Sequence, residues 1–194
     1  MLQLLNQFDT QLFLFLNGLH APFLDPLMVF VSGKLSWIPL YLFFLYLIFK
    51  SSNGRSQIIL ILLFVALLIS VSDQVSVQAF KKVFERPRPC HEVDLQPYIY
   101  MPGGECGGAF GFISSHAANS FAIAGFLFLL LRKHFRWIGY VVFPYGIIVS
   151  YSRIYLGVHY PGDVMIGAMV GLLIGWLIFL LFQFMQKHVC PQQC

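Results

Sequence analysis

The sequence predicts an all-α fold: a polytopic bundle of about five to six transmembrane helices, preceded by a helix that lies in the membrane interface. One observation is composition, since 58% of the 194 residues are hydrophobic and only 10% are Asp, Glu, Lys or Arg. Soluble domains carry about 25% charged residues. The other is that the apolar runs approach the roughly 20 residues a helix needs to cross hydrocarbon. We therefore expect an integral membrane protein.

The interfacial helix is predicted within residues 1–20, where apolar and polar side chains alternate at helical spacing. The apolar positions are Leu4, Leu5, Phe8, Leu12, Phe15 and Leu16. A helix with one apolar and one polar face is typical of the membrane interface. Asn6, Asp9 and Asn17 count against a sixth span here. A basic leader and a small-residue cleavage site are lacking, so we expect this helix to be retained.

Five apolar stretches are predicted to span the membrane, namely residues 27–49, 58–80, 117–131, 137–155 and 161–184. The third is the shortest and is expected to extend outward through residues 114–116. In the last, Gly167, Gly171 and Gly175 recur at every fourth position, which predicts close approach of a neighbouring helix.

The basic residues of the short connections predict the orientation. They lie between the first and second spans, between the third and fourth, and after the fifth: Lys50, Arg55, Arg132, Lys133, Arg136 and Lys187. This side is expected to be cytoplasmic, together with a tail at residues 185–194. The loop 81–116 and the turn 153–163 then face outward, which in a bacterial inner membrane is the periplasm. The chain is expected to form a single domain over residues 1–194.

The net charge of +4 is modest and sits at helix ends, which excludes a nucleic-acid-binding protein. Three polar clusters instead occupy the outward ends of different helices: KKVFERPRP at residues 81–89, SSHAANSF at 114–121 and SRIYLGVHYPGD at 152–163. One such cluster alone would be explained by cations that reach for the interface. Three together, where charge is costly, predict a catalytic site.

The cations of these clusters suit a phosphoryl group. Lys81, Arg88 and Arg153 are predicted to bind its oxygens, because Arg offers paired planar donors and Lys a point charge. Ser114 and the backbone N–H of Ser115 lie where the third span begins, and a helix N-terminus favours anions. We expect these five residues to bind phosphate.

Two histidines suit a two-step transfer. Asp163 lies four residues after His159, across a proline that is expected to open the last span, so it can fix the tautomer of His159 as the nucleophile. His116 remains to protonate the departing oxygen. Asn119 and Ser120, one turn beyond His116, are expected to line the same pocket.

These clusters resemble the tripartite signature of the type-2 phosphatidic acid phosphatase superfamily: Lys, six residues, Arg-Pro; Pro-Ser-Gly-His; and Ser-Arg, five residues, His, three residues, Asp. The matching residues are Lys81, Arg88, Pro89, Ser114, His116, Ser152, Arg153, His159 and Asp163. Ile113 and Ser115 depart from the middle pattern, which affects the loop geometry and not the catalytic set. The resemblance implies a helical membrane bundle and metal-independent hydrolysis of a lipid phosphate or pyrophosphate through a phosphohistidine, without a cofactor.

The outward site favours undecaprenyl pyrophosphate as the substrate. Lipid A 1-phosphate, phosphatidylglycerophosphate and phosphatidic acid fit the same geometry. Other classes remain open: a phospholipid or phosphate transporter, an intramembrane serine peptidase, or a metal hydrolase using His116, His159 and Asp163. The oligomeric state stays undetermined.

The cysteines fall into two pairs. Cys90 and Cys106 share the outward loop and are predicted to form a disulfide that restrains the phosphate-binding residues. Cys190 and Cys194 lie on the predicted cytoplasmic tail and are expected to be free thiols.

Overall fold

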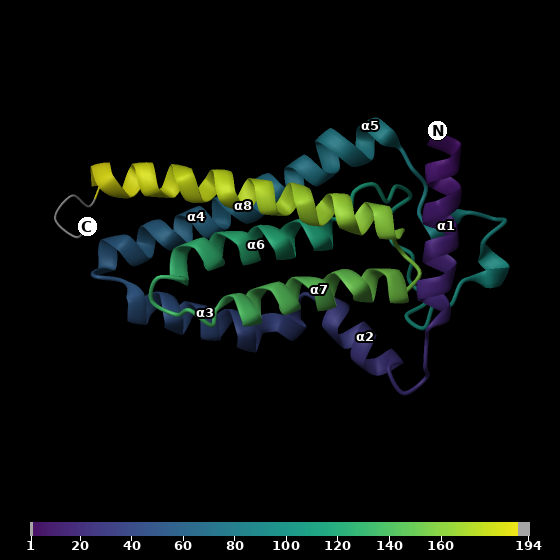
Figure 1. The fold of residues 1–194 in the computed structure, drawn as a ribbon, viewed down its shortest axis with the longest axis horizontal. Helices are drawn as coiled ribbons and strands as arrows, with labels where there is room; N and C mark the ends of the chain where they lie inside the picture. The colour runs from purple at the N-terminus through teal and green to yellow at the C-terminus, as the bar shows by residue number, and fades with distance from the viewer. Residues whose placement is uncertain (1, 190–194) are drawn as a thin grey trace.

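The computed structural model describes residues 2–189, which form a helical bundle without strands (Figure 1). In chain order the α-helices of this described part are α1 (Leu2–Gly18), α2 (Asp25–Ser32), α3 (Ile38–Ser51), α4 (Arg55–Gln74), α5 (Lys82–Phe84), α6 (Ser115–Leu131), α7 (Gly139–Tyr155) and α8 (Pro161–Val189). The π-helix η2 (Val75–Lys81) and the 3-10 turns η1 (Leu35–Trp37), η3 (Pro89–His91) and η4 (Gln96–Tyr98) lie between them.

The long helices α4, α6, α7 and α8 run along the long axis of the molecule, with α3 beside them. Helix α1 stands across one end of this bundle, next to the start of α8 and the loop that follows α5 (Figure 1). The three predicted polar clusters lie at this same end, which we call the site end. The position and direction of α1 are those expected of the interfacial helix that the sequence predicts. That α1 lies in the membrane interface stays a prediction.

The polytopic helical bundle is confirmed, and among residues 2–189 two helices, or three if a bent pair counts as one span, are long and apolar enough to cross a membrane. Arg55–Phe84 and Pro161–His188 qualify as membrane spans, and Asp25–Ser32 with Leu35–Ser51 adds a third if that bent pair counts as one. The stretches predicted at 117–131 and 137–155 form α6 and α7, each of 17 residues. A count of five spans therefore requires these two short helices to cross as well, and a count of six requires α1 in addition.

The first predicted span, at residues 27–49, is not one continuous helix, because the chain bends by 86° between α2 and α3. Gly33 ends α2 in an extended conformation, and the Trp37 indole N–H donates to the carbonyl of Val31 at 2.7 Å. The Ser36 hydroxyl donates to the carbonyl of Phe30. These bonds satisfy carbonyls that the end of a helix leaves free. A hydropathy pattern does not detect such a break, since both halves are apolar.

Two predicted boundaries also move. The second span continues through η2 to Phe84, so Lys81 lies on a helix and not at the start of a loop. Helix α8 continues to Val189, so residues 185–189 of the predicted tail are helical. Cys190 and Cys194 lie outside the described residues.

Helices α6 and α8 pack in close contact, as the glycine spacing predicts. A Cβ atom added at Gly171 would lie 2.2 Å from the carbonyl oxygen of Ala118, and one at Gly167 would lie 2.8 Å from that of Ser114. These glycines therefore set the distance between the helix that begins at Ser115 and the helix that begins at Pro161.

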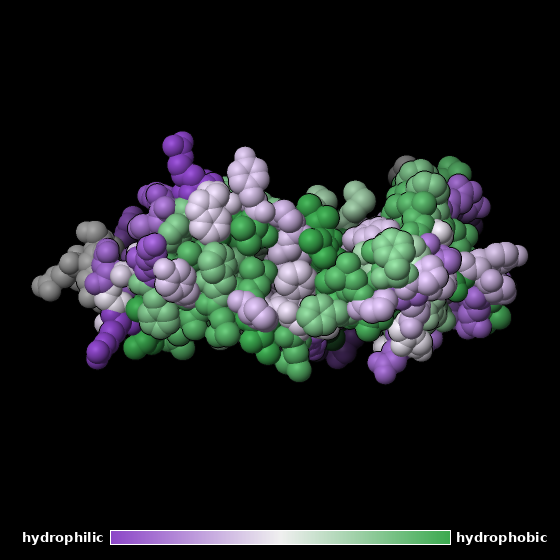
Figure 2. Space-filling model, turned by 90° about the horizontal axis from the view of Figure 1, so that it is seen from below, coloured by the Kyte–Doolittle hydropathy of each residue, from purple (hydrophilic) through white to green (hydrophobic). Residues whose placement is uncertain are grey.

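The outer surface of the bundle is apolar. Leu63 and Met169, on α4 and α8, are 62% and 64% exposed. Figure 2 shows hydrophobic residues across the middle of one face and hydrophilic ones gathered toward its two ends. This distribution suits a protein surrounded by hydrocarbon.

Candidate active site

The eight sequence-predicted site residues all lie at the site end. They come from the end of η2, the loop after α5, the start of α6, the end of α7, the turn between α7 and α8, and the start of α8. The backbone N–H of Ser114 donates to the carbonyl of Asp163 at 3.0 Å, which joins the second and third clusters. Lys81 Nζ donates to Ser115 Oγ at 2.8 Å, which joins the first cluster to the second.

His159 and Asp163 form the pair that their spacing predicts. Pro161 opens α8, and His159 Nδ1 lies 3.4 Å from Asp163 Oδ2, which also accepts from the backbone N–H of Tyr160 at 3.0 Å. Both side chains are buried, with His159 1% and Asp163 0% exposed. Because Nδ1 faces the carboxylate, the tautomer that has its proton on Nδ1 carries its lone pair on Nε2.

The electrostatics of His159 favour its neutral form. Burial lowers its pKa well below the ordinary value, and the charges of Arg88, Arg153 and Lys81 lower it further. A neutral imidazole is the form that can act as a nucleophile. The same cations favour an anionic ligand beside it.

The three predicted cations reach the site from different elements. Arg88 Nη1 donates to the carbonyl of Cys106 at 3.1 Å, and Arg153 Nη1 donates to the Ser32 hydroxyl. The Nε atoms of Arg88 and Arg153 are buried, and within residues 2–189 they have no hydrogen-bond partner. Buried guanidinium donors without a protein acceptor are what a bound phosphoryl oxygen would satisfy.

The start of α6 carries the remaining predicted residues. Ser114 is the N-cap of this helix, and its hydroxyl accepts from the backbone N–H of Ala117, which leaves its O–H free to donate. The Ser115 hydroxyl contacts both Lys81 and Ser76, the latter at 2.7 Å. Arg153, Lys34 and Lys81 lie close enough to His116 for their charges to act on it.

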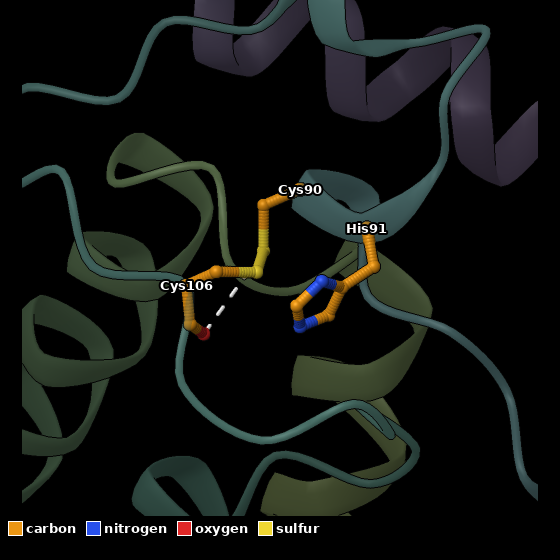
Figure 3. Close-up of side chains that lie close together, drawn as sticks. All are labelled: Cys90, His91 and Cys106. Carbon is orange, nitrogen blue, oxygen red and sulfur yellow. Dashed lines mark hydrogen bonds between the residues drawn. A yellow bond between two sulfur atoms is a disulfide. The ribbon is translucent and has the colours of Figure 1, made fainter.

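The predicted disulfide is present and shapes the loop that carries Arg88. Cys90 and Cys106 are bonded, with their Cα atoms 5.9 Å apart (Figure 3). The imidazole of His91 lies beside the sulfur atoms, and the ligand atoms of these three residues lie within 4.8 Å of one another. Since the two sulfurs are bonded to each other, they are not free thiolates for a metal ion.

Two charged residues that sequence reasoning did not select complete the network around Asp163. Arg86 donates to Asp163 Oδ1 at 2.9 Å and pairs with Asp9 Oδ2 at 2.8 Å. Asp9 Oδ1 accepts from the backbone N–H of Gly162 at 2.7 Å, and the Arg86 guanidinium lies 4.0 Å from the ring centre of Tyr160. The only signal for Asp9 is an acid on a largely apolar helix, and Arg86 resembles any interfacial cation.

A cavity of about 880 Å³ opens beside His116 and extends between α3, α4 and α6. Ser115, His116 and Asn119 line its polar end, with Lys34 and Asp73 from other elements. Apolar side chains line the remainder, among them Phe44, Ile48, Val65, Ile123 and Leu127. The cavity reaches His116 and not His159, so it approaches the site from one side only.

Comparison with known proteins identifies the family. The PAP2 superfamily matches residues 60–187. A lipid A 4'-phosphatase of Bacteroides thetaiotaomicron is 39% identical over 180 residues, covering 92% of this chain and 79% of that protein. A lipid A 4'-phosphatase of Porphyromonas gingivalis is 32% identical over 187 residues, covering 96% and 78%. An undecaprenyl-diphosphatase of Sulfolobus acidocaldarius is 30% identical over 179 residues, covering 91% and 78%.

The fold is also shared with a solved structure. The transmembrane PAP2-type phosphatidylglycerolphosphate phosphatase of Bacillus subtilis superposes with a TM-score of 0.69 and 20% identity, over 95% of this chain and 87% of that one. The family match, these relatives and the shared bundle lead to one conclusion. The chain belongs to the PAP2 superfamily and is an integral membrane hydrolase that acts on lipid phosphates.

Proposed function

We propose that this enzyme hydrolyses a phosphate monoester of a lipid A-type glycolipid at the outer face of the bacterial inner membrane. The reaction proceeds through a phosphohistidine on His159. The observation that carries the mechanism is the buried His159–Asp163 pair surrounded by Lys81, Arg88 and Arg153. A neutral imidazole with its lone pair on Nε2, beside cations, is suited to attack on a phosphoryl group.

In the first step, His159 Nε2 attacks phosphorus and the bond to the lipid oxygen breaks. The lipid oxygen leaves as an alcohol after taking a proton from His116. Lys81, Arg88 and Arg153 neutralise charge on the phosphoryl oxygens during the transfer. Arg86 and the backbone N–H of Tyr160 hold Asp163 so that it faces His159 Nδ1.

In the second step, water replaces His159 on phosphorus. His116, now neutral, takes a proton from that water, the bond from phosphorus to Nε2 breaks, and inorganic phosphate leaves. The two histidines thus return to their starting protonation states. This chemistry needs no metal ion and no cofactor, and the residues named above supply every proton transfer.

The cavity supports this division of roles. In-line transfer places the nucleophile and the leaving oxygen on opposite sides of phosphorus. The cavity borders His116 and not His159, so a lipid body within it is attached to the leaving oxygen. His116 therefore lies on the side where an acid is needed.

The choice of lipid A over undecaprenyl pyrophosphate is supported by the relatives. The two lipid A 4'-phosphatases are 39% and 32% identical over nearly the whole chain. A second candidate substrate is undecaprenyl pyrophosphate, which the predicted topology favours and for which the Sulfolobus relative at 30% identity argues. Its leaving group is a phosphate, which depends less on protonation than a sugar hydroxyl does.

The orientation is part of the proposal. The basic residues at the end opposite the site, such as Lys50 and Arg132, favour a cytoplasmic position for that end. A disulfide in the loop beside the site favours an oxidising compartment for the other.

The test is phosphate release by the purified full-length chain in lipid nanodiscs containing chelator, with lipid A 4'-phosphate and undecaprenyl pyrophosphate as parallel substrates. We expect faster turnover of the glycolipid. His159→Ala should lower that turnover by about 10⁴-fold or more and abolish the trapped phosphoenzyme. His116→Ala should slow phosphoenzyme formation by about 10²- to 10⁴-fold for the sugar ester, and less for the pyrophosphate.

His134→Ala, on the exposed turn at the opposite end, is the matched control, and its phosphate release should equal that of wild type. Wild-type turnover by His159→Ala, or complete loss of activity with chelator, would contradict the mechanism. Faster cleavage of the pyrophosphate than of the glycolipid would contradict the substrate and leave the mechanism standing.

A further inference from the structure

We propose that the polar end of the cavity beside His116 recognises a leaving group that carries hydrogen-bond donors, such as the amide or hydroxyl of an amino sugar, and that Asn119 Oδ1 accepts one of them. This inference rests on the proposed function, because it concerns the lipid body attached to the leaving oxygen. It assigns the residues that distinguish a glycolipid from a polyprenyl chain.

The first observation is the state of the Asn119 side chain. Asn119 lies on α6 three residues after His116 and lines the same cavity. Its Oδ1 atom is buried, and no described residue donates a hydrogen bond to it. A buried amide oxygen without a donor is costly, and most such groups are paired in folded proteins. A donor from a ligand in the cavity would remove that cost.

The second observation is that neighbouring polar groups of the cavity are already paired. Ser120 Oγ donates to the carbonyl of Ala117 at 3.2 Å, and the Tyr41 and Tyr145 hydroxyls bond to each other at 2.9 Å. The unpaired oxygen of Asn119 is therefore not a general property of the cavity wall. It lies one helical turn from the residue that faces the leaving oxygen.

The third observation is the charge at this end. Asp73, near the end of α4, and Lys34, between α2 and η1, line the cavity together with Asn119. A carboxylate accepts hydrogen bonds and an ammonium donates them. A sugar ring next to the ester oxygen offers both donors and acceptors. The phosphate of undecaprenyl phosphate offers acceptors only, and the isoprene units beyond it offer neither. The set Lys34, Asp73 and Asn119 matches a sugar.

The size and remaining walls of the cavity fit the same ligand. A volume of about 880 Å³ lies within the range of small-molecule sites. Beyond Asn119 the lining becomes apolar along Ile123 and Leu127 of α6, so a sugar at the polar end would lead into a region suited to acyl chains.

The experiment compares kcat/KM of the full-length chain on lipid A 4'-phosphate and on undecaprenyl pyrophosphate. Asn119→Leu keeps the approximate size of the side chain and removes the acceptor. We expect the ratio of the two kcat/KM values to shift against the glycolipid by about 10- to 100-fold, because a substrate donor is left unpaired. Ser120→Ala is the matched control, since the Ser120 hydroxyl is already bonded to the helix, and the ratio should not change.

Binding gives a second measurement that does not depend on turnover. Binding of dephosphorylated lipid A to the same nanodisc samples should be about 10-fold or more weaker for Asn119→Leu than for wild type, and binding of undecaprenyl phosphate should not weaken in parallel. An equal loss of binding affinity for both lipids, or no loss for either lipid, would overturn the inference. If wild type binds the sugar in this way but releases no phosphate from any lipid, the proposed function fails and the binding site stands.

Discussion

Helix α6 has two faces that differ in how much freedom they allow. One face lies against α8, where a single added methyl group at Gly171 would overlap the carbonyl oxygen of Ala118. The other face, with Asn119, Ile123 and Leu127, borders the cavity. The contact face fixes the start of α6 against Asp163, while the cavity face leaves room for a ligand.

This difference separates two tasks along one helix, namely positioning the reacting groups and accommodating the lipid. Residues that touch phosphorus must be held to a fraction of an ångström, which the closely packed contact face provides. Residues that accommodate the lipid need space, which the cavity face provides. Substitutions on the two faces should therefore have different kinds of effect.

The largest effect is expected from breaking the contact face. Gly171→Leu cannot be accommodated without moving α8 from α6, so we expect loss of the folded protein after extraction and no phosphatase activity. Even Gly171→Ala should reduce the free energy of unfolding by about 1–3 kcal/mol, through overpacking. Thermal unfolding in nanodiscs measures both.

The control is Gly18→Ala at the end of α1, where an added Cβ meets nothing within 4 Å. A Gly171→Leu protein with wild-type melting temperature would show that the two helices are not constrained as described.

The next effect concerns the charges that hold Asp163 on the fixed side. Arg86→Met removes the donor to Asp163 Oδ1, so we expect kcat to fall by about 10- to 100-fold with little change in KM, because Arg86 is engaged by the carboxylates of Asp163 and Asp9. Asp9→Asn should lower kcat less, since the amide oxygen can still accept from Gly162.

Asn17→Ala is the matched control on α1, because Asn17 bonds the carbonyls of Tyr100 and Tyr155 and not the Arg86 network. It should lower the melting temperature without the same loss of kcat. A rise in KM alone for Arg86→Met would instead assign Arg86 to substrate binding.

A smaller effect is expected on the cavity face. Ile123→Trp fills part of the cavity, so kcat/KM for the glycolipid should fall by about 10-fold. The melting temperature should stay near that of wild type, since the added volume has room. Steady-state kinetics and thermal unfolding on the same sample separate the two quantities, and a large loss of stability would argue that this face is as constrained as the other.

The smallest effect concerns pH. The folded chain keeps His159 neutral, because burial holds its pKa well below the ordinary value of about 6.5, whereas the unfolded chain takes up the proton near that value. Stability is therefore fully present above about pH 6.5 and decreases as the pH falls below it, by at most about 1.4 kcal/mol per pH unit for one proton. The melting temperature of His159→Gln should depend less on pH between pH 7 and pH 5 than that of wild type. The same dependence of melting temperature on pH in both proteins would argue against a neutral buried imidazole.

The sequence predicted much of this organisation, for reasons that particular residues make clear. Pro161 marks a helix start, and the spacing of His159 and Asp163 across it predicts their contact, so both are local features. The bend after Ser32 was missed because it depends on the bond from Trp37 to Val31, which apolar composition does not reveal.

The sequence alone does not identify Arg86 and Asp9, because their roles depend on contacts between residues that are far apart in the chain. Asp9 and Gly162 are 153 residues apart in the chain and in hydrogen-bond contact in the fold. Arg86 and Arg88 lie in the same short motif, and only the fold shows that the first pairs with two carboxylates while the second faces a backbone carbonyl.

The position of α1 has a practical consequence for anyone who purifies this enzyme. The helix leaves Leu4, Phe8 and Phe15 more than half exposed, at 69%, 66% and 64%, and meets the Arg86–Asp163 ion pair through Asp9. A small, harsh detergent that solvates these side chains would dissociate α1 from the bundle and inactivate the enzyme. The remaining helices would keep their circular dichroism signal. Nanodiscs are the safer preparation, and recovery of activity on moving an inactive detergent sample into lipid would show that the helix had come loose.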